Sequence, residues 1–420
     1  MTSKAPLECF RYQDLLEDVD LKDVAERAFG REGLGIGVVT GVPDVSHLSR
    51  ELFTLGHRFA ALPEETKNRY QHPASSYSFG WSHGKETLEA DKPDLAKGSY
   101  YANPCFDSPF ADDPAMMARH PALAHPNIWP DSDVAGFSDA FKALGQVVVR
   151  VGVLVARQCD RYVETVHRGY EAGKLSRIVS TSRCCKGRLL HYFPRTADAS
   201  NNSDNHINNN NNNNNNTGGA SGAERSGAGA SAEGGRGADE EGGEEKDSFS
   251  DWCGWHHDHS SLTGLVPAVL LDADGREVQN ADPNCGLFIR SRQVGGGALV
   301  KASLPVGESA SSCLLFQIGE TTQVHSAGAL QATPHAVRST SQQGKRGYER
   351  QQIRVREAFA VFMQPEWGES MDVPRGTDLG STRSLHAASL LPRQAAPITE
   401  RLRPGMDFGA FTQATCASYY

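Results

Sequence analysis

The sequence predicts an α+β protein, mainly β with helices, in which a helical N-terminal region precedes a β core built as a sandwich or barrel. Two observations lead to this class. Within residues 1–175, apolar residues recur at helical spacing over long stretches. After residue 185, apolar runs shorten to strand length, and Gly, Pro, Asn and Asp fall between most of them. Short strands with frequent turns are typical of sandwiches and barrels rather than of βαβ units.

Two helices stand out in the N-terminal region. Residues 44–62, "DVSHLSRELFTLGHRFAAL", place Leu48, Leu52 and Phe59 on one face, and Asp44 is positioned as a possible N-cap. Residues 133–163, "DVAGFSDAFKALGQVVVRVGVLVARQCDRYV", are long enough, and apolar enough on one side, for a central packing helix. This region therefore supplies the helices against which the β core packs.

Seven strands are expected in the second half of the chain. Each is a run of four to ten residues rich in apolar and β-branched side chains. They are residues 188–193, 265–272, 286–292, 298–304, 313–318, 335–339 and 356–365.

One segment differs sharply from both halves. Residues 196–247 contain a run of nine asparagines, then a Gly/Ala/Ser-rich stretch and an acidic block, and they contribute −7 of the formal net charge of −9. Such a composition cannot bury enough apolar surface to offset its ordering entropy, so we expect a disordered low-complexity insertion. Both flanks look structured, and lengthening a surface loop costs little, so this segment is interpreted as a loop insertion rather than a domain boundary.

The insertion leads to a direct prediction. Replacing residues 198–246 with a short Gly/Ser linker should preserve the fold and metal binding, because the segment offers nothing to pack on the core. Circular dichroism and thermal unfolding of the shortened chain would check this. A cooperative loss of the folded state would contradict it.

Composition also limits the partners and the compartment. Outside the insertion the chain is nearly neutral, and no basic face typical of a nucleic-acid binder is visible. No apolar stretch reaches the length of a membrane span, and the N-terminus lacks the apolar core of a secretory signal. Nine scattered cysteines without a CxxC pair favour reduced thiols in an intracellular protein, with the cytoplasm as the expected compartment. The oligomeric state stays open.

The stretch "GWHHDHSSLTGL", residues 254–265, concentrates three histidines and an aspartate. Side chains alternate faces on an extended strand, so His256 and Asp258 share one face, while His257 and His259 share the other. A His/carboxylate pair suits a hard metal, whereas a His/His pair suits zinc or copper, and this stretch alone does not decide between them. His335, in "GALQATPHAVRS", adds a distant third ligand. With His256 and Asp258 it would form the facial triad of two histidines and one carboxylate that binds non-haem Fe(II).

Around these residues the sequence resembles the 2-oxoglutarate- and Fe(II)-dependent dioxygenases of the isopenicillin N synthase-like type. "HHDHSSLT", residues 256–263, is similar to the first ligand motif of that family, H-T-D-x-G-x-L-T, with Ser260 in place of Gly. "GALQATPHAV" resembles the stretch that ends in the distal histidine, here His335. "GLGIGVVTGVP", "GWSHGKE" and "NIWP" look like the N-terminal half of the same family.

The resemblance implies a double-stranded β-helix, or jelly-roll, core. Residues 176–195 and 248–366 would form the core, residues 1–175 the helical N-terminal region, and residues 367–420 a C-terminal tail packing on the core. It also implies an enzyme that uses Fe(II) and the co-substrate 2-oxoglutarate. Such an enzyme oxidises, by default hydroxylates, a small organic molecule with O2 and releases succinate and CO2.

The family anchors the far carboxylate of 2-oxoglutarate with an R-x-S motif, and the resemblance assigns this role to Arg356, nine residues before Pro365. The hydroxyl position is then Ala358, and Arg354 is a rival anchor. The family's N-Y-Y-P motif corresponds to "HYFP", which places His191 and Phe193 beside the cofactor. These altered contacts keep one alternative open, an Fe(II) oxidase of the same fold that does not use 2-oxoglutarate. A second alternative is a non-catalytic binding protein that keeps the fold and uses the acidic, Asn-rich insertion as an interaction tail.

Overall fold

The structure is a computed structural model, and the residues it describes belong to one compact unit. They are residues 3–85, 87–89, 92–120, 124–193, 253–272, 275–278, 285–291, 298–338, 355–377 and 397–419. The predicted insertion and Arg354 lie outside the described residues.

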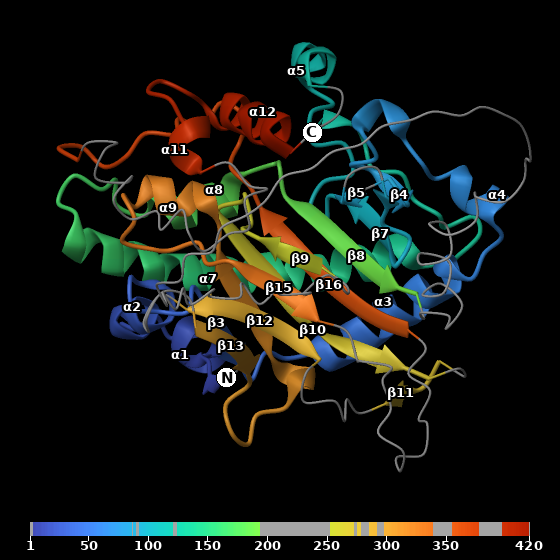
Figure 1. Ribbon diagram of the computed structural model, residues 1–420, viewed down its shortest axis with the longest axis horizontal. Coiled ribbons are helices and arrows are strands. Elements are labelled where there is room, and N and C mark those ends of the chain that lie inside the picture. Colours follow the sequence, from blue (N-terminus) through green and yellow to red (C-terminus); the bar gives the residue numbers. More distant parts are fainter. Residues whose placement is uncertain are drawn as a thin grey trace, which may run out of the picture. The chain divides into compact units, whose positions relative to one another are not determined.

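Two β-sheets form the centre of the described chain (Figure 1). The larger sheet has the strand order β2-β3-β14-β10-β16-β8-β7-β4, and β11 pairs with β10 beside this path. Its pairs are antiparallel except for β2 with β3. The strands are β2 (Glu8–Arg11), β3 (Ile36–Thr40), β14 (Leu314–Ile318), β10 (Leu262–Leu271), β16 (Val355–Met363), β8 (Lys186–Tyr192), β7 (Lys97–Ala102), β4 (Gly80–His83) and β11 (Glu277–Val278).

The smaller sheet has the order β1-β13-β12-β15-β9, and a separate pair joins β5 to β6. Its strands are β1 (Ser3–Pro6), β13 (Ala298–Ser303), β12 (Gly286–Ser291), β15 (His335–Arg338) and β9 (Cys253–His256). The short pair consists of β5 (Thr87–Glu89) and β6 (Lys92–Pro93). Buried residues of the two sheets share one apolar cluster, in which Ile36 and Val38 of the larger sheet pack with Ile289 of the smaller one. The sheets therefore face each other across a common interior.

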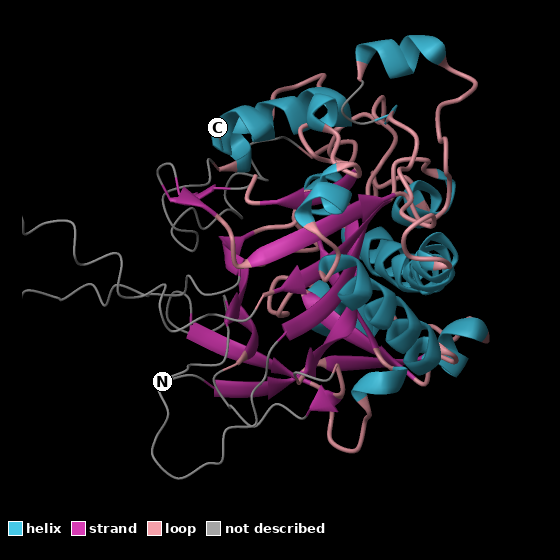
Figure 2. Cartoon of the chain, turned by 90° about the vertical axis from the view of Figure 1, so that its right-hand side faces the viewer, coloured by secondary structure: helices cyan, strands magenta, loops and turns pink. Residues whose placement is uncertain are grey.

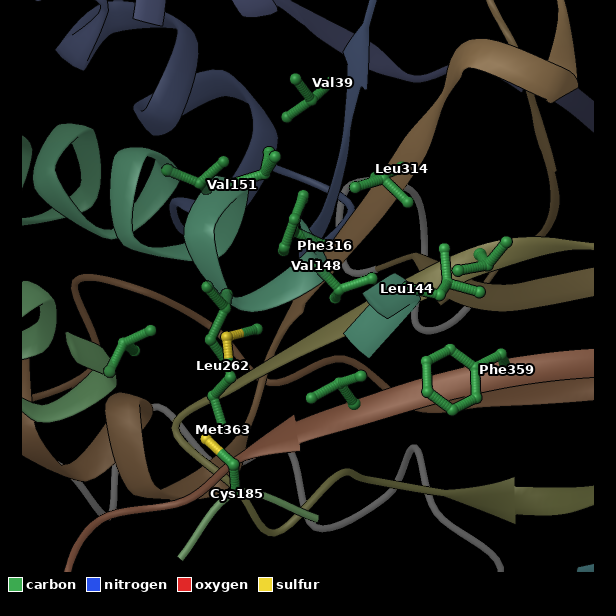
Figure 3. Packing of buried hydrophobic residues seen from close by; sticks show 14 of the residues in the cluster. Val39, Leu144, Val148, Val151, Cys185, Leu262, Leu314, Phe316, Phe359 and Met363 are labelled. Atoms are coloured by element: carbon green, nitrogen blue, oxygen red, sulfur yellow. The ribbon is translucent and has the colours of Figure 1, made fainter. Parts of the chain in front are cut away.

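Helices cover the outer face of the larger sheet, and Figure 2 shows most of them gathered on one side of the strands. The main helices of this layer are α2 (Lys22–Phe29), α3 (Val45–Ala60), α7 (Phe137–Val166) and α8 (Lys174–Thr181). In Figure 3, Leu144 and Val148 of α7 lie among Leu262, Phe316 and Phe359 of the sheet, and all five are buried. This contact is the main hydrophobic core.

The packing between α7 and the sheet depends on close approach. A Cβ atom added at Gly264 would lie 2.2 Å from a methyl carbon of Val148, and one added at Gly152 would lie 2.6 Å from the sulfur of Met363. Glycine at these two positions therefore lets helix and strands approach each other closely. Because β10 carries the residues that follow the HxD motif, this packing also fixes where the motif lies.

All seven predicted strands are present, as β8, β10, β12, β13, β14, β15 and β16, and both predicted helices are present as α3 and α7. Two details differ. Asp44 occupies the N-cap position of α3, but its φ is +62° and its side chain makes no capping hydrogen bond. The N-terminal region is also not purely helical, because it contributes β2, β3, β4 and β7 to the larger sheet. "IGVVT" of β3 is buried at every position, which is typical of a central strand.

The remaining α-helices among the described residues are short or lie near the C-terminus. They are α1 (Tyr12–Leu16), α4 (Glu64–Asn68), α5 (Pro114–Arg119), α9 (Glu320–His325), α11 (Ile398–Arg401) and α12 (Phe408–Tyr419). Ile398 and Phe411 of the last two helices share a buried cluster with Val324 of α9 and with Trp367. Among the described helices, none combines the length and the apolar character needed to cross a membrane.

Candidate metal centre and its surroundings

The structure brings His256, Asp258 and His335 together. His256 ends β9 and lies directly opposite His335, the first residue of β15, in the antiparallel register of the two strands. Asp258 follows two residues after the end of β9. Its Oδ1 lies 3.9 Å from Nε2 of His256 and 3.7 Å from Nε2 of His335. The candidate ligand atoms of the three residues all lie within 4.8 Å of one another.

Backbone hydrogen bonds orient both imidazoles. Nδ1 of His256 donates to the carbonyl oxygen of Gly254 at 2.8 Å, and Nδ1 of His335 donates to that of Thr333 at 3.1 Å. A carbonyl can only accept, so each Nδ1 carries the proton and each neutral ring keeps its Nε2 lone pair for the site. Burial lowers the pKa of His335 to about 4, so this imidazole is neutral near pH 7. Both rings therefore have the form in which histidine binds a metal.

Asp258 supplies the carboxylate. The residue is buried, and its Oδ2 has no hydrogen-bond partner. A buried carboxylate oxygen without a partner is costly in a protein, and a bound cation removes that cost. The set of two neutral imidazoles and one carboxylate fits Fe(II) in the facial-triad arrangement.

The backbone around Asp258 is fixed by the start of α9. The Glu320 amide donates to the carbonyl oxygen of Asp258 at 2.8 Å, and the Gly319 amide donates to that of Ser261 at 3.1 Å. A Cβ atom at Gly319 would lie 1.8 Å from the carbonyl oxygen of Ser260, so only glycine allows this approach. The start of α9 therefore fixes the position of the loop that carries Asp258.

His257 and His259 point away from the metal group and toward one buried carboxylate. Nδ1 of His257 lies 3.3 Å from Oε1 of Glu320, and Nδ1 of His259 lies 3.6 Å from Oε2. Nε2 of His259 also lies within hydrogen-bond distance, 3.0 Å, of Oγ1 of Thr412 on α12. His256 and Asp258 thus lie at the metal group, and His257 and His259 lie beside Glu320, although β9 itself ends at His256.

Arg401 of α11 completes this network by donating two hydrogen bonds to Glu320, at 2.9 and 2.7 Å. Burial raises the pKa of Glu320, but the hydrogen bond from His257, the nearby imidazole of His259 and the charge of Arg401 outweigh it and hold this pKa well below its usual range. Sequence reasoning missed Glu320 and Arg401. Neither lies in a recognisable motif, and only the fold brings α9 and α11 to the metal loop.

The predicted 2-oxoglutarate anchor lies on the inner face of β16. Arg356, Ala358 and Phe362 share this face by alternation, while Phe359 on the other face packs against α7. The guanidinium of Arg356 lies 4.8 Å from the ring centre of Tyr192, its register partner on β8. Ala358 is buried in an apolar cluster with Tyr192. Arg356 therefore faces the interior between the sheets, as an anchor would.

The predictions for His191 and Phe193 need correction. His191 lies opposite Glu357 in the register of β8 and β16, and its Nδ1 is hydrogen-bonded to that carboxylate at 2.6 Å. Both side chains therefore lie on the helix-covered face of the sheet. Phe193 packs edge-on against His191 and belongs to the main core, not to the interior between the sheets.

The physical reason is a one-residue shift in register. The match of "HYFP" to the N-Y-Y-P motif assigned the cofactor contacts to His191 and Phe193, but the residues that face the interior are Leu190 and Tyr192. Shifting a strand register by one residue exchanges the two faces. Tyr192 is thus the aromatic residue beside Arg356, and sequence reasoning assigned that place to its neighbour.

A cavity of about 420 Å³ opens in front of the metal group. His256 and Asp258 line it together with Phe362, the register partner of Lys186. Four cationic side chains reach this cavity, namely Lys85, Arg183, Lys186 and Arg188. Aromatic rings line it as well, those of Tyr77, Phe79, Tyr101, Phe362 and Trp367. Asp258 is the one carboxylate among the described lining residues.

Among these four cations, Lys186 contacts a backbone carbonyl and an aromatic ring. Its Nζ donates to the carbonyl oxygen of Ser78 at 2.8 Å and lies 3.3 Å from the ring centre of Phe79. No described carboxylate lies within ion-pair distance of it. Burial lowers the pKa of Lys186 to about 7. Arg183, by contrast, is engaged by Glu366 at 3.3 Å and by Asp112 at 3.1 Å.

Comparison with known proteins gives a family match in the N-terminal half and a shared fold over the chain. Residues 26–132 match the family model of the N-terminal region of the non-haem dioxygenase in morphine synthesis. No curated protein matches the sequence. The matched residues include α3, which packs on the larger sheet, and β3, β4 and β7, which are strands of that sheet.

Solved structures share the fold. A 2OG-Fe(II) oxygenase family protein from Caulobacter crescentus is 16% identical, with 99% of each chain covered and a TM-score of 0.61. A full-length protein from Neurospora crassa, solved in complex with alpha-KG, is 17% identical, with 98% of this chain and 95% of that chain covered and a TM-score of 0.58. The same protein in complex with alpha-KG and thymine is 16% identical over 98% and 96%, with the same TM-score. The family-model match and the shared fold confirm the resemblance to the 2-oxoglutarate/Fe(II)-dependent dioxygenases.

Proposed function

We propose that this protein is an Fe(II)- and 2-oxoglutarate-dependent oxygenase that oxidises a small organic molecule. The observation that carries the proposal is the convergence of His256, Asp258 and His335, with both Nε2 lone pairs freed by Nδ1 hydrogen bonds to backbone carbonyls. The two facing sheets are then the double-stranded β-helix of the family. The resemblance and the N-terminal match support the same reaction class.

The residues of the chain have distinct roles in this proposal. His256, Asp258 and His335 would hold Fe(II), which together with 2-oxoglutarate supplies the oxidising chemistry and leads to succinate, CO2 and oxidised product. Arg356 would fix the far carboxylate of 2-oxoglutarate, and the apolar residues around Ala358 would exclude water from it. Glu320 would keep the metal loop in place through His257 and His259.

The co-substrate gives the first test of this proposal. Arg356→Lys should weaken 2-oxoglutarate binding strongly, because lysine cannot reproduce the bidentate fork that arginine offers to a carboxylate. Ala358→Ser should strengthen binding, because a hydroxyl on the same face adds a hydrogen bond to a charged group, a gain of about 1.5–3 kcal/mol at most. A succinate assay across both variants measures the two effects as changes in KM for 2-oxoglutarate.

Arg354→Lys is the matched comparison, since Arg354 is the rival anchor two residues away. It should leave the KM for 2-oxoglutarate near that of the parent protein. If both lysine variants release succinate like the parent, Arg356 is not the anchor. If the parent consumes O2 and substrate without releasing succinate, the protein is an Fe(II) oxidase that does not use 2-oxoglutarate.

The cavity indicates the kind of substrate. We infer an anionic, aromatic small molecule, because four cations and five aromatic rings line the space in front of the metal group. Lys186 is the residue best placed to receive the negative group. A carboxylate near its ammonium would add the charge partner that this half-buried side chain lacks, and such a contact is stronger where water is partly excluded.

Matched acid and amide probes test this inference. Benzoate should stimulate succinate release above the substrate-free rate more than benzamide does, and Lys186→Met should remove the difference. Lys142→Met, at a surface lysine paired with Asp107, is the control and should preserve the preference. Equal stimulation by the acid and the amide in the parent protein would contradict an anionic substrate.

A further inference from the structure

A second group of potential metal ligands lies on the helix-covered face of the larger sheet, and it does not belong to the triad. It consists of His57 on α3, His191 on β8 and Glu357 on β16, three elements far apart in the sequence. Their candidate ligand atoms all lie within 4.8 Å of one another. These side chains are on the opposite face of the sheet from Arg356 and the cavity.

The carboxylate of this group has fewer hydrogen-bond partners than a buried carboxylate needs. Glu357 is completely buried. Its Oε1 accepts a hydrogen bond from Nδ1 of His191 at 2.6 Å, but its Oε2 has no hydrogen-bond partner. Burying a carboxylate oxygen without a partner is unfavourable, so the structure leaves one strong acceptor available at this point.

His57 places a second polar atom without a hydrogen-bond partner beside the Glu357 carboxylate. Its Nδ1 is buried and has no hydrogen-bond partner, and it lies 3.9 Å from Oε1 of Glu357, too far for a hydrogen bond. The two imidazole rings are tilted toward each other, with their centres 5.8 Å apart. Three donor atoms therefore converge, and two polar atoms of the group lack partners.

We propose that His57, His191 and Glu357 form a second metal site, which takes Zn²⁺ and is separate from the Fe(II) site. Two imidazoles and one carboxylate are a common zinc donor set, and a water molecule can complete a tetrahedron. The His57 side chain is 35% exposed, whereas the other two are almost fully buried, so the ion and its water can arrive from the α3 side.

A metal at this position would have a structural effect. It would tie α3 to β8 and β16, the two strands whose opposite faces carry Arg356 and Lys186. Binding to the folded chain alone raises its stability by mass action, so the site should stabilise the protein increasingly as the free Zn²⁺ concentration rises. This proposal does not depend on the oxygenase function.

The test uses the full chain with the triad disabled. Asp258→Ala/His335→Ala protein, stripped with a chelator and titrated with Zn²⁺, should bind about one equivalent and show a higher Tm. When His57→Ala is added to this protein, its affinity for Zn²⁺ should fall at least about tenfold. The increase in Tm on adding Zn²⁺ should disappear as well. His47→Ala, at an exposed histidine of the same helix, is the matched control and should keep both.

Glu357→Gln keeps the size of the side chain but removes its charge, so it should lose Zn²⁺ affinity like His57→Ala. Because His57 is partly exposed, its variant keeps the test valid if Glu357→Gln fails to fold. Failure of the triad-disabled protein to bind Zn²⁺ would overturn the proposal. Unchanged Zn²⁺ binding by His57→Ala, relative to His47→Ala, would overturn it as well.

Discussion

Asp258→Ala should abolish detectable Fe(II) binding and all succinate release. Asp258 is the only carboxylate in the sequence between Asp251 and Asp272, and no other described carboxylate lies within the group formed with His256 and His335. Without it, two neutral imidazoles remain, and they provide neither the charge nor the third ligand of the triad. Iron content after anaerobic reconstitution and gel filtration measures the effect.

His257→Ala is the control for this prediction. Its side chain faces Glu320 rather than the metal group, so the variant should keep most of its iron while losing some stability. Loss of iron in His257→Ala together with its retention in His256→Ala would show that the assignment is displaced by one residue.

Arg401→Met should lower the free energy of unfolding by about 3–5 kcal/mol, the usual cost of removing one partner from a buried ion pair. Arg401 and Glu320 are both almost completely buried, and the variant leaves the Glu320 carboxylate without its bidentate partner. Urea unfolding at pH 7 measures the change. Glu320→Gln/Arg401→Met should recover part of the loss, because the unpaired charge is gone.

Arg177→Met is the matched comparison, since Arg177 pairs with Glu369 at 2.9 Å but is 42% exposed. Its loss should cost less than about 1 kcal/mol. A similar cost for the two arginine variants would contradict the role assigned to the buried network.

The same pair predicts a pH dependence. The pKa of Glu320 is lower in the folded chain than its ordinary value of 4.5, because its hydrogen bonds and Arg401 outweigh the effect of burial. Its contribution to stability is therefore fully present above about pH 4.5 and is lost as the pH falls toward the folded pKa. Unfolding curves between pH 6 and pH 3 should show this loss in the parent protein and a smaller one in Arg401→Met.

Much of the fold could be predicted because local pattern and tertiary structure agree. The seven predicted strands, β8, β10 and β12 to β16, are short apolar runs between turn residues, and α7 has one continuous apolar face. β2, β3, β4 and β7 were missed because a short apolar run does not reveal which sheet it joins. β3 and β7 pair with the distant strands β14 and β8, and β2 and β4 join the sheet through β3 and β7.

The triad could be predicted because two of its ligands share one motif and the third has a recognisable context. The surroundings could not, for two physical reasons. Glu320 meets His257, and Arg401 meets Glu320, only in the folded chain, and nothing local to their positions indicates it. His191 and Phe193 were assigned by a motif match, and on a strand a shift of one residue is enough to exchange the two faces.

The most direct test of the central claim is an anaerobic titration of the purified protein with Fe(II) and then with 2-oxoglutarate, followed by visible absorption. We predict the weak charge-transfer band of an Fe(II)–2-oxoglutarate chelate, saturating near one equivalent of each per chain. It should be absent in Asp258→Ala and should need more 2-oxoglutarate in Arg356→Lys. Iron bound at the triad without any such band, at saturating 2-oxoglutarate, would contradict the proposed function.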